Sequence, residues 1–147
     1  MVCLGNICRS PLAEGILQAK LPKDQFFVDS AGTSGYHNEN PPDIRSIEVA
    51  KKHGLDISNQ KSRLFKSFDF ELFDYIFVMD QFNYKTLIRQ AQKDKDIEKV
   101  NLILNYPGSK IKEVPDPYYG GDQGFEEIYK LLDSACEFHS ELLKNNL

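Results

Sequence analysis

The chain has 147 residues, a formal net charge of −4 at pH 7 and a pI of about 5.4. Its acidic balance argues against nucleic-acid binding and against adsorption to anionic membranes, because both need a basic surface. Hydrophobic residues make up 41% of the chain, which is enough for a folded core. No apolar run reaches the roughly 20 residues of a membrane span. The length predicts a single domain over residues 1–147.

Four stretches have the apolar spacing and the end signals of helices. The first should cover residues 10–21, with Ser10 as its cap and Pro11 in its first turn. Asp43 is predicted to cap a second helix over 43–53, which Gly54 ends. Residues 83–93 and 125–144 complete the set. The last helix carries an inward-facing stripe: Ile128, Leu131, Leu132, Ala135, Cys136 and Leu142.

Strands are predicted over residues 26–30, 74–80 and 99–106, after a first strand that ends at Cys3. Strands that alternate with helices predict a parallel sheet covered on both faces. We therefore expect an α/β fold with a four-stranded parallel sheet and helices on both faces. Only Met1 and Val2 precede Cys3, whereas a strand usually has about five residues. Either the centre of the sheet is short, or a few natural residues are missing before Met1.

The loop between the first strand and the first helix, residues 4–9 (LGNICR), has the features of an anion site. Ligands of open parallel sheets bind beyond the carboxyl ends of the strands, where such loops lie. Gly5 and Asn6 accept left-handed backbone angles, so the loop can turn its N–H groups inward. The helix N-terminus and the fork of Arg9 would add to this phosphate-binding loop. The same environment lowers the pKa of a thiol, which makes Cys3 a candidate nucleophile.

Three cysteines are present, at positions 3, 8 and 136, and we see no N-terminal secretion signal. An odd number of cysteines in such a chain predicts reduced thiols and a cytoplasmic location. Secretion without a signal peptide stays open as an alternative. The cysteines make a poor zinc site because no histidine pair accompanies them. The histidines also lack metal-ligand spacing, so we expect no metal and interpret them as structural or solvated: His37, His53 and His139.

The segment VCLGNICRSPLAEG, residues 2–15, resembles the signature of the low-molecular-weight protein tyrosine phosphatases. DPYYGG, residues 116–121, resembles the acid loop of the same family. Between them, VDSAGTSGY, NPPDIR and FDYIFVMD also match family segments in the family's order. The resemblance covers nearly the whole chain, and two separate motifs at the right separation make it specific.

The resemblance implies a role for three residues. Cys3 would attack phosphorus and form a phosphocysteine, and Arg9 would hold two oxygens of the phosphoryl group. Asp116 would protonate the leaving tyrosine oxygen and later activate water. The phosphate would lie on the amides of the loop. No metal or cofactor would be needed, because the loop itself neutralises the charge. The residues that surround the phosphate would be Leu4, Gly5, Asn6, Ile7, Cys8 and Ser10.

Tyr36, Tyr118 and Tyr119 match family positions that form the walls of the substrate pocket. Stacked rings there would hold a phenyl phosphate and reject the shorter phosphoserine. For Tyr118, an ordinary surface position is an equally good interpretation. Asn6, Ser10 and Ser30 match positions whose side chains brace the loop, and Ser10 could also donate to the Cys3 sulfur.

Two further positions concern the surroundings of the nucleophile. In the resembling family the cysteine that matches Cys8 can form a disulfide with the nucleophile, which shields it from over-oxidation. A small packing thiol is the alternative for Cys8. The family often has a histidine shortly after the segment GLDIS, where this chain has Asn59 and Gln60. This departure concerns the side chains that support the phosphate loop and not the residues that would carry out the chemistry.

Four other functions fit these residues less well than a tyrosine phosphatase does. An arsenate reductase of the same architecture needs two further cysteines downstream, and the chain has only Cys136. A protein arginine phosphatase tends to carry threonine where this chain has Ile7, and an apolar Ile7 suits an aromatic substrate better. A binding module without catalysis does not explain why Cys3, Arg9 and Asp116 are all present. A purely structural domain does not explain so many reactive groups at one end of the sheet.

We therefore expect a cytoplasmic tyrosine phosphatase that hydrolyses phosphotyrosine and other aryl phosphate monoesters. Its partners would be phosphotyrosine proteins or peptides, and inorganic phosphate would be its product. We expect a monomer or a weak dimer, with no nucleic acid bound.

Overall fold

A computed structural model describes residues 1–118 and 122–147 of the chain. It contains a four-stranded, all-parallel sheet in the order β2-β1-β3-β4, which confirms the predicted fold class. The strands are short: β1 (Val2–Cys3), β2 (Ala31–Gly32), β3 (Ile76–Val78) and β4 (Val100–Leu102). β1 lies between β2 and β3, with Val2 opposite both Ala31 and Val78.

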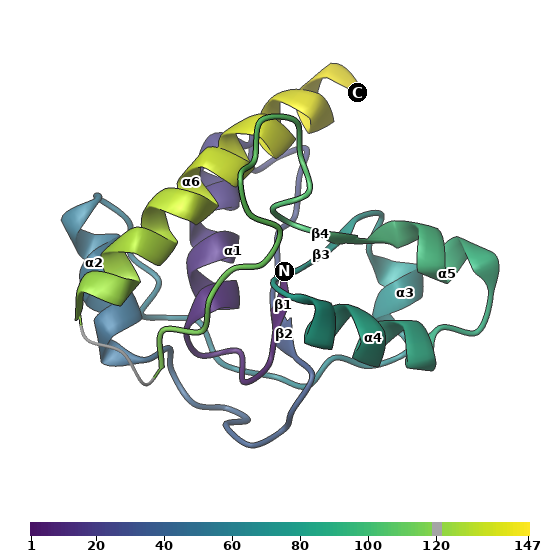
Figure 1. Cartoon of the computed structure of the whole chain (residues 1–147), viewed down its shortest axis with the longest axis horizontal. Helices are drawn as coiled ribbons and strands as arrows, with labels where there is room; N and C mark the ends of the chain where they lie inside the picture. The colour runs from purple at the N-terminus through teal and green to yellow at the C-terminus, as the bar shows by residue number, and fades with distance from the viewer. Residues whose placement is uncertain (119–121) are drawn as a thin grey trace.

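Six helices of the described residues flank this sheet (Figure 1). One side carries α1 (Arg9–Lys20), α2 (Ile44–Lys52) and α6 (Asp122–Asn145), and α1 and α2 both contact α6. The other side carries α3 (Asp69–Leu72), α4 (Gln81–Gln90) and α5 (Asp94–Lys99). No helix within the described ranges is long and apolar enough to cross a membrane.

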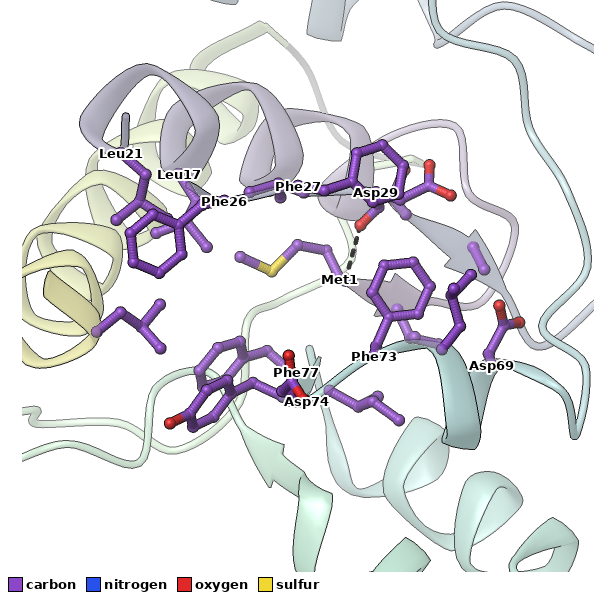
Figure 2. A pocket seen from close by; sticks show the side chains of 18 of the residues that line it. Met1, Leu17, Leu21, Phe26, Phe27, Asp29, Asp69, Phe73, Asp74 and Phe77 are labelled. Carbon is purple, nitrogen blue, oxygen red and sulfur yellow. Dashed lines mark hydrogen bonds between the residues drawn. The ribbon is translucent and has the colours of Figure 1, made fainter. Parts of the chain in front are cut away.

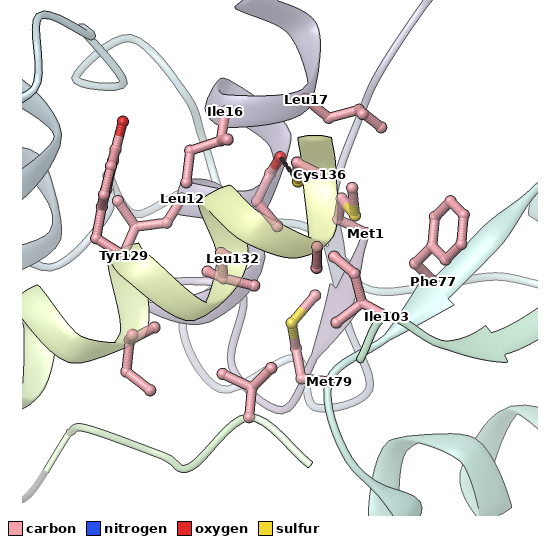
Figure 3. Packing of buried hydrophobic residues seen from close by; sticks show 14 of the residues in the cluster. Met1, Leu12, Ile16, Leu17, Phe77, Met79, Ile103, Tyr129, Leu132 and Cys136 are labelled. Carbon is pink, nitrogen blue, oxygen red and sulfur yellow. Dashed lines mark hydrogen bonds between the residues drawn. The ribbon is translucent and has the colours of Figure 1, made fainter. Parts of the chain in front are cut away.

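The two faces of the sheet have separate hydrophobic cores, because successive strand residues point to opposite sides. Cys3, Phe77 and Met79 belong to the larger core under α1 and α6. Val2 and Val78 belong to the smaller core under α3 and α4. Figure 3 shows the larger core, in which Leu12 and Ile16 of α1 meet Leu132 and Cys136 of α6. Cys136 is fully buried, as predicted.

The predicted strand over residues 26–30 is wrong. The segment lies outside the sheet, and the ordered pairing begins only at β2. The physical reason is that β1 offers residues 26–30 almost no backbone to pair with. Among them, Asp29 accepts a bond from the Met1 ammonium, just before β1 begins. The backbone N–H of Val28 instead donates to the side chain of Gln18 on α1.

The helix ends also differ from the predictions in part. Asp43 caps α2 as expected, since its carboxylate accepts from the Arg45 amide, and Gly54 follows the helix with φ of 82°. The predicted cap at Ser10 is wrong, because α1 begins at Arg9 and Ser10 already lies in the first turn, buried. On α6, Leu142 is 48% exposed, so its predicted inward position is wrong and Leu143 is buried instead.

The predicted boundaries of the other elements are too wide or shifted. β3 occupies only the centre of the strand predicted over 74–80, and β4 only the first part of the strand predicted over 99–106. α4 begins before the predicted residue 83, because Asp80 and Asn83 form a capping box. The short helices α3 and α5 were not predicted, because neither is long enough to show an amphipathic repeat.

Candidate active site

The candidate active site begins at the carboxyl end of β1, in the loop that leads into α1. Asn6 is the residue of this loop with a positive φ, 57°, and its side chain is buried. Gly5 does not have the left-handed angle that the sequence suggested. A Cβ atom at Gly5 would lie 3.0 Å from Cδ2 of His37, so any larger residue there would require the imidazole ring to shift by a few tenths of an ångström.

The carbonyl groups of this loop are bonded to its surroundings. Cys3 and Leu4 accept from the amides of Thr33 and Ser34, at 3.0 and 2.9 Å. Ile7 accepts from the Asp43 amide at 2.8 Å, and Cys8 accepts from the Ser46 hydroxyl at 3.2 Å. Since these carbonyls are held from outside, we expect the N–H groups of the loop to point toward the space that it encloses.

A chain of buried polar side chains connects the loop to the Cys3 sulfur. The Asn6 amide donates to Ser10 Oγ at 2.7 Å and to Ser30 Oγ at 3.0 Å. Ser10 Oγ lies 3.0 Å from Cys3 Sγ, within hydrogen-bond distance. Ser30 in turn donates to Glu14 Oε1 at 2.7 Å. The sequence had placed Asn6, Ser10 and Ser30 around the loop, and the structure brings them together.

Glu14 and Gln60 complete the surroundings of this network. Burial raises the pKa of Glu14, although the bond from Ser30 opposes the effect. Gln60, near the position where the resembling family often has a histidine, donates to the Pro11 carbonyl at 3.0 Å. Glu14 was not singled out in the sequence, because a glutamate on a helix is most often solvated.

Arg9 is 3% exposed, and its guanidinium group is held by a carboxylate. Its Nη1 donates to Asp80 Oδ2 at 2.7 Å and to the Val114 carbonyl at 3.0 Å. Its Nη2 lies 3.7 Å from Asp116 Oδ2. Burial acts to lower the pKa of Arg9, but Cys3, Asp80 and Asp116 outweigh it and the pKa rises. Arg9 is therefore a permanent cation beside Cys3.

Asp116 and Tyr118 face the loop across a pocket of about 400 Å³. The Asp116 carboxylate is 42% exposed and accepts the Tyr118 amide at 3.0 Å, which fixes the turn between them. Nine residues predicted to form the site line this pocket: Cys3, Leu4, Gly5, Ile7, Cys8, Arg9, Tyr36, Asp116 and Tyr118. Tyr119, predicted as a third aromatic wall, lies outside the described residues.

Four residues near the site were not singled out from the sequence as part of it. His37 and Ser34 also line the pocket, and the His37 ring lies 6.4 Å from that of Tyr118. His37 had been interpreted as structural or solvated, so its place at the pocket corrects that interpretation. Asp80 and Arg45 touch Arg9 and Tyr118 respectively. Each looked like an ordinary residue at the start of a helix.

Cys8 differs from Cys3 in its surroundings, although both are buried thiols. Burial, together with the nearby carboxylate of Asp43, raises the pKa of Cys8 to about 12. A thiol with such a pKa is almost entirely protonated at neutral pH and is a poor nucleophile. The two cysteines of the loop are therefore not interchangeable.

Comparison with known proteins places this geometry in a family. The family model of the low molecular weight phosphotyrosine protein phosphatases matches residues 1–147. The chain belongs to this family. The human low molecular weight phosphotyrosine protein phosphatase is 43% identical over 141 residues, covering 92% of this chain and 88% of that protein. A putative family member from Synechocystis is also 43% identical, with the same coverage.

Solved structures of tyrosine phosphatases share the fold. A tyrosine phosphatase from Entamoeba histolytica, crystallised with Hepes in its active site, has a TM-score of 0.91 and 38% identity. That match covers 99% of this chain and 96% of the other. Wzb from Vibrio vulnificus, in complex with benzylphosphonate, has a TM-score of 0.86 and 34% identity, covering 95% and 94%. The protein is therefore an enzyme of the tyrosine phosphatase class.

Proposed function

We propose that this phosphatase hydrolyses phosphotyrosine and other aryl phosphate monoesters through a phosphocysteine on Cys3. The observation that carries the proposal is that Cys3, Arg9 and Asp116 line one pocket at the carboxyl end of β1. Three groups of different chemistry meet there: a thiol, a permanent cation and a carboxyl group. A phosphoryl transfer to a thiol needs a nucleophile, a cation that binds the phosphate and an acid that protonates the leaving group, and these three groups can fill those roles.

In the first step, the Cys3 thiolate attacks phosphorus and the bond from phosphorus to the tyrosine oxygen breaks. The hydroxyl of Ser10, 3.0 Å from the sulfur, would stabilise the thiolate. The loop amides, the start of α1 and Arg9 would hold the three equatorial phosphoryl oxygens in the geometry of the transition state, over which the charge of the transferred group is spread. Cys8 does not suit the role of nucleophile, because its pKa is raised to about 12.

Asp116 would act as the general acid of this step and the general base of the next. The phenol of tyrosine has a pKa near 10, so its oxygen leaves poorly without a proton. Asp116 would donate that proton and then, as a carboxylate, take one from the water that attacks the phosphocysteine. Because the enzyme must combine a Cys3 thiolate with a protonated Asp116, we expect the rate to be highest at acidic pH.

The walls of the pocket favour a flat aromatic leaving group. Tyr36, His37 and Tyr118 line the mouth, and Ile7 adds an apolar side chain. Tyr36 is 90% exposed, so its ring is free to pack against a substrate. Such walls suit phosphotyrosine better than phosphoserine, whose short side chain would not bring its phosphate down to the loop. Related Wzb has been solved with benzylphosphonate, a ligand that joins a phenyl ring to a phosphonate.

We further propose that the physiological partners are phosphotyrosine proteins or peptides and that inorganic phosphate is released. We propose that the chain acts as one domain, as a monomer or weak dimer in the cytoplasm. The Cys3–Cys8 disulfide stays a prediction: both residues line the same pocket, so a sulfenic acid on Cys3 would have a thiol near it.

The test is steady-state hydrolysis of p-nitrophenyl phosphate and of a phosphotyrosine peptide, with EDTA present, by the parent chain and by Cys3→Ser. We expect both substrates to be cleaved by the parent and neither by the variant, because a serine hydroxyl is a far weaker nucleophile than a thiolate. Cys8→Ser is the matched control and should retain activity on both substrates. Retained activity in Cys3→Ser would refute the proposed role of that thiol.

The same assay, with a phosphoarginine peptide as a third substrate, separates the second candidate, a protein arginine phosphatase. Phosphoarginine has no aromatic ring to pack between Tyr36 and Tyr118. We therefore expect the parent to prefer the phosphotyrosine peptide by at least an order of magnitude in kcat/KM. A reversed preference would assign the enzyme to phosphoarginine instead.

A further inference from the structure

Arg45, on the first turn of α2, connects the two loops that form the active site. We propose that Arg45 is a positioning residue that holds the general acid Asp116 in place over the phosphate loop. The inference rests on the proposed function, because it concerns the efficiency of the Asp116 proton transfer. It is carried by a continuous series of hydrogen bonds from the loop after β1 to the Asp116 carboxylate.

The first part of the series fixes the start of α2 to the phosphate loop. The Asp43 amide donates to the Ile7 carbonyl at 2.8 Å, and Ser46 Oγ donates to the Cys8 carbonyl at 3.2 Å. Both contacts are made by residues that flank Arg45 at the helix start. The base from which Arg45 extends is therefore fixed relative to Cys3.

The second part fixes the side chain of Arg45 itself. Its Nε and Nη2 atoms donate to the two carboxylate oxygens of Asp43, each at 3.0 Å. This two-bond pairing locks the plane of the guanidinium group. The bonds from Arg45 also lower the pKa of Asp43, so the pair stays charged through the acidic range in which the enzyme should work. The Arg45 side chain is only 26% exposed.

The third part reaches the acid. Arg45 Nη2 donates to the Tyr118 carbonyl at 2.8 Å, and the Tyr118 amide donates to Asp116 Oδ1 at 3.0 Å. The guanidinium carbon also lies 4.6 Å from the ring centre of Phe125, which is buried on α6, and 5.8 Å from that of Tyr118. The Arg45 guanidinium therefore contacts Asp43, which is bonded to the phosphate loop, Tyr118 of the acid loop, and Phe125 of α6.

This arrangement has a consequence for catalysis, because Asp116 must lie within hydrogen-bond reach of the leaving oxygen. The Asp116 side chain is 42% exposed, and its contact with Arg9, at 3.7 Å, is longer than a hydrogen bond. The Asp116 carboxylate is restrained by the bond that it accepts from the Tyr118 amide. Arg45 holds Tyr118 in turn, because its Nη2 donates to the Tyr118 carbonyl. Loss of Arg45 should misplace the proton donor without changing Cys3 or Arg9.

The test compares kcat/KM for two substrates that differ in their need for a proton. Phenyl phosphate releases a phenol with a pKa near 10 and depends on the general acid, whereas p-nitrophenol leaves readily as an anion. For Arg45→Ala we expect kcat/KM to fall on the order of tenfold with phenyl phosphate and by less than about twofold with p-nitrophenyl phosphate. Arg45→Gln, which keeps most of the volume, provides a second variant if Arg45→Ala does not fold.

Two further variants make the result specific. Asp116→Asn should show the same preference for p-nitrophenyl phosphate, and adding Arg45→Ala to it should change the ratio no further, because the two residues act as one unit. Arg63→Gln is the matched control: Arg63 also pairs with two carboxylates, Asp29 and Asp69, but it does not contact the pocket. It should leave the ratio of the two substrates unchanged.

The outcomes separate this inference from the proposed function. Equal losses on both substrates in Arg45→Ala and Arg45→Gln would overturn the positioning role, and so would an additive loss in the double variant. If instead the parent chain hydrolyses neither substrate, the proposed function fails, and the Arg45 inference that rests on it fails with it.

Discussion

Arg9 is the residue whose surroundings most constrain the chemistry of the site. A cation at a helix N-terminus is unfavourable unless an anion accompanies it. Asp80 is such an anion, with its Oδ2 2.7 Å from Arg9 Nη1. It also caps α4, since its carboxylate accepts the Asn83 amide. One side chain thus orients Arg9, the proposed phosphate-binding residue, and begins a helix.

Asp80→Asn separates these two roles, because asparagine caps a helix about as well as aspartate. We expect the variant to lose about 3 kcal/mol of unfolding free energy, the lower limit for a buried arginine that loses its partner. Its kcat/KM for p-nitrophenyl phosphate should fall on the order of tenfold, since Asp80 no longer fixes the orientation of the Arg9 guanidinium group. Urea unfolding and steady-state kinetics measure both effects.

Asp80→Ala is the control for the helix cap and should cost about 1 kcal/mol more than Asp80→Asn. An Asp80→Asn variant as stable and as active as the parent would contradict the role assigned to this ion pair. The sequence did not reveal Asp80, because an aspartate before a helix is a common cap. Its second role depends on β1 and β3 being neighbours in the sheet.

At the level of elements, β1 has only two residues, as β2 does, although it is one of the two inner strands of the sheet. A cavity of about 580 Å³ lies at its amino end, between the segment that contains Phe26 and the one that contains Phe73 and Phe77 (Figure 2). The Met1 ammonium is buried there against the Asp29 carbonyl, and this burial lowers its pKa. The cavity continues the line of β1 and is lined largely by apolar side chains.

We therefore expect four added residues before Met1, alternating threonine and valine, to extend β1 into this cavity. Two buried valines would contribute about 1.5–3 kcal/mol each. Ordering the added backbone costs about 1–2 kcal/mol per residue, which new ladder hydrogen bonds offset in part. A net gain of about 1 kcal/mol would raise Tm by about 2–4 °C.

Differential scanning calorimetry of the extended chain measures the change. A Gly-Ser extension of the same length is the control and should leave Tm unchanged, because it buries no apolar side chain. Equal Tm values for the Thr-Val extension, the control and the parent would show that the cavity does not accept a strand.

The four longer helices and the parallel sheet could be predicted because they depend on patterns of several residues. The strand expected over 26–30 failed although its residues favour strands, because a strand also needs a partner and β1 provides only Met1 there. Leu142 and Leu143 differ in burial although they are identical and adjacent, because the last turn of α6 meets the core through one of them alone. Such outcomes depend on tertiary contacts that no local pattern contains.

At the level of the whole molecule, the site is assembled from segments that are distant in sequence. Cys3 and Arg9 come from the first ten residues, whereas Asp116 comes from beyond β4. The family resemblance pointed to all three, and they line one pocket. The residues that hold them in place, Asp80 and Arg45, were found only from contacts across the fold.

The central claim is that Cys3 carries the phosphoryl group during turnover. The most direct test is rapid mixing of the enzyme with a radiolabelled phosphotyrosine peptide, a quench in detergent, and mapping of the label after proteolysis. Asp116→Asn, mixed instead with radiolabelled p-nitrophenyl phosphate, should accumulate the intermediate, because p-nitrophenol leaves without a proton donor while the base that hydrolyses the phosphocysteine is missing. We predict label on the peptide that contains Cys3, and none in Cys3→Ser. Turnover without label, or label on another residue, would contradict the account.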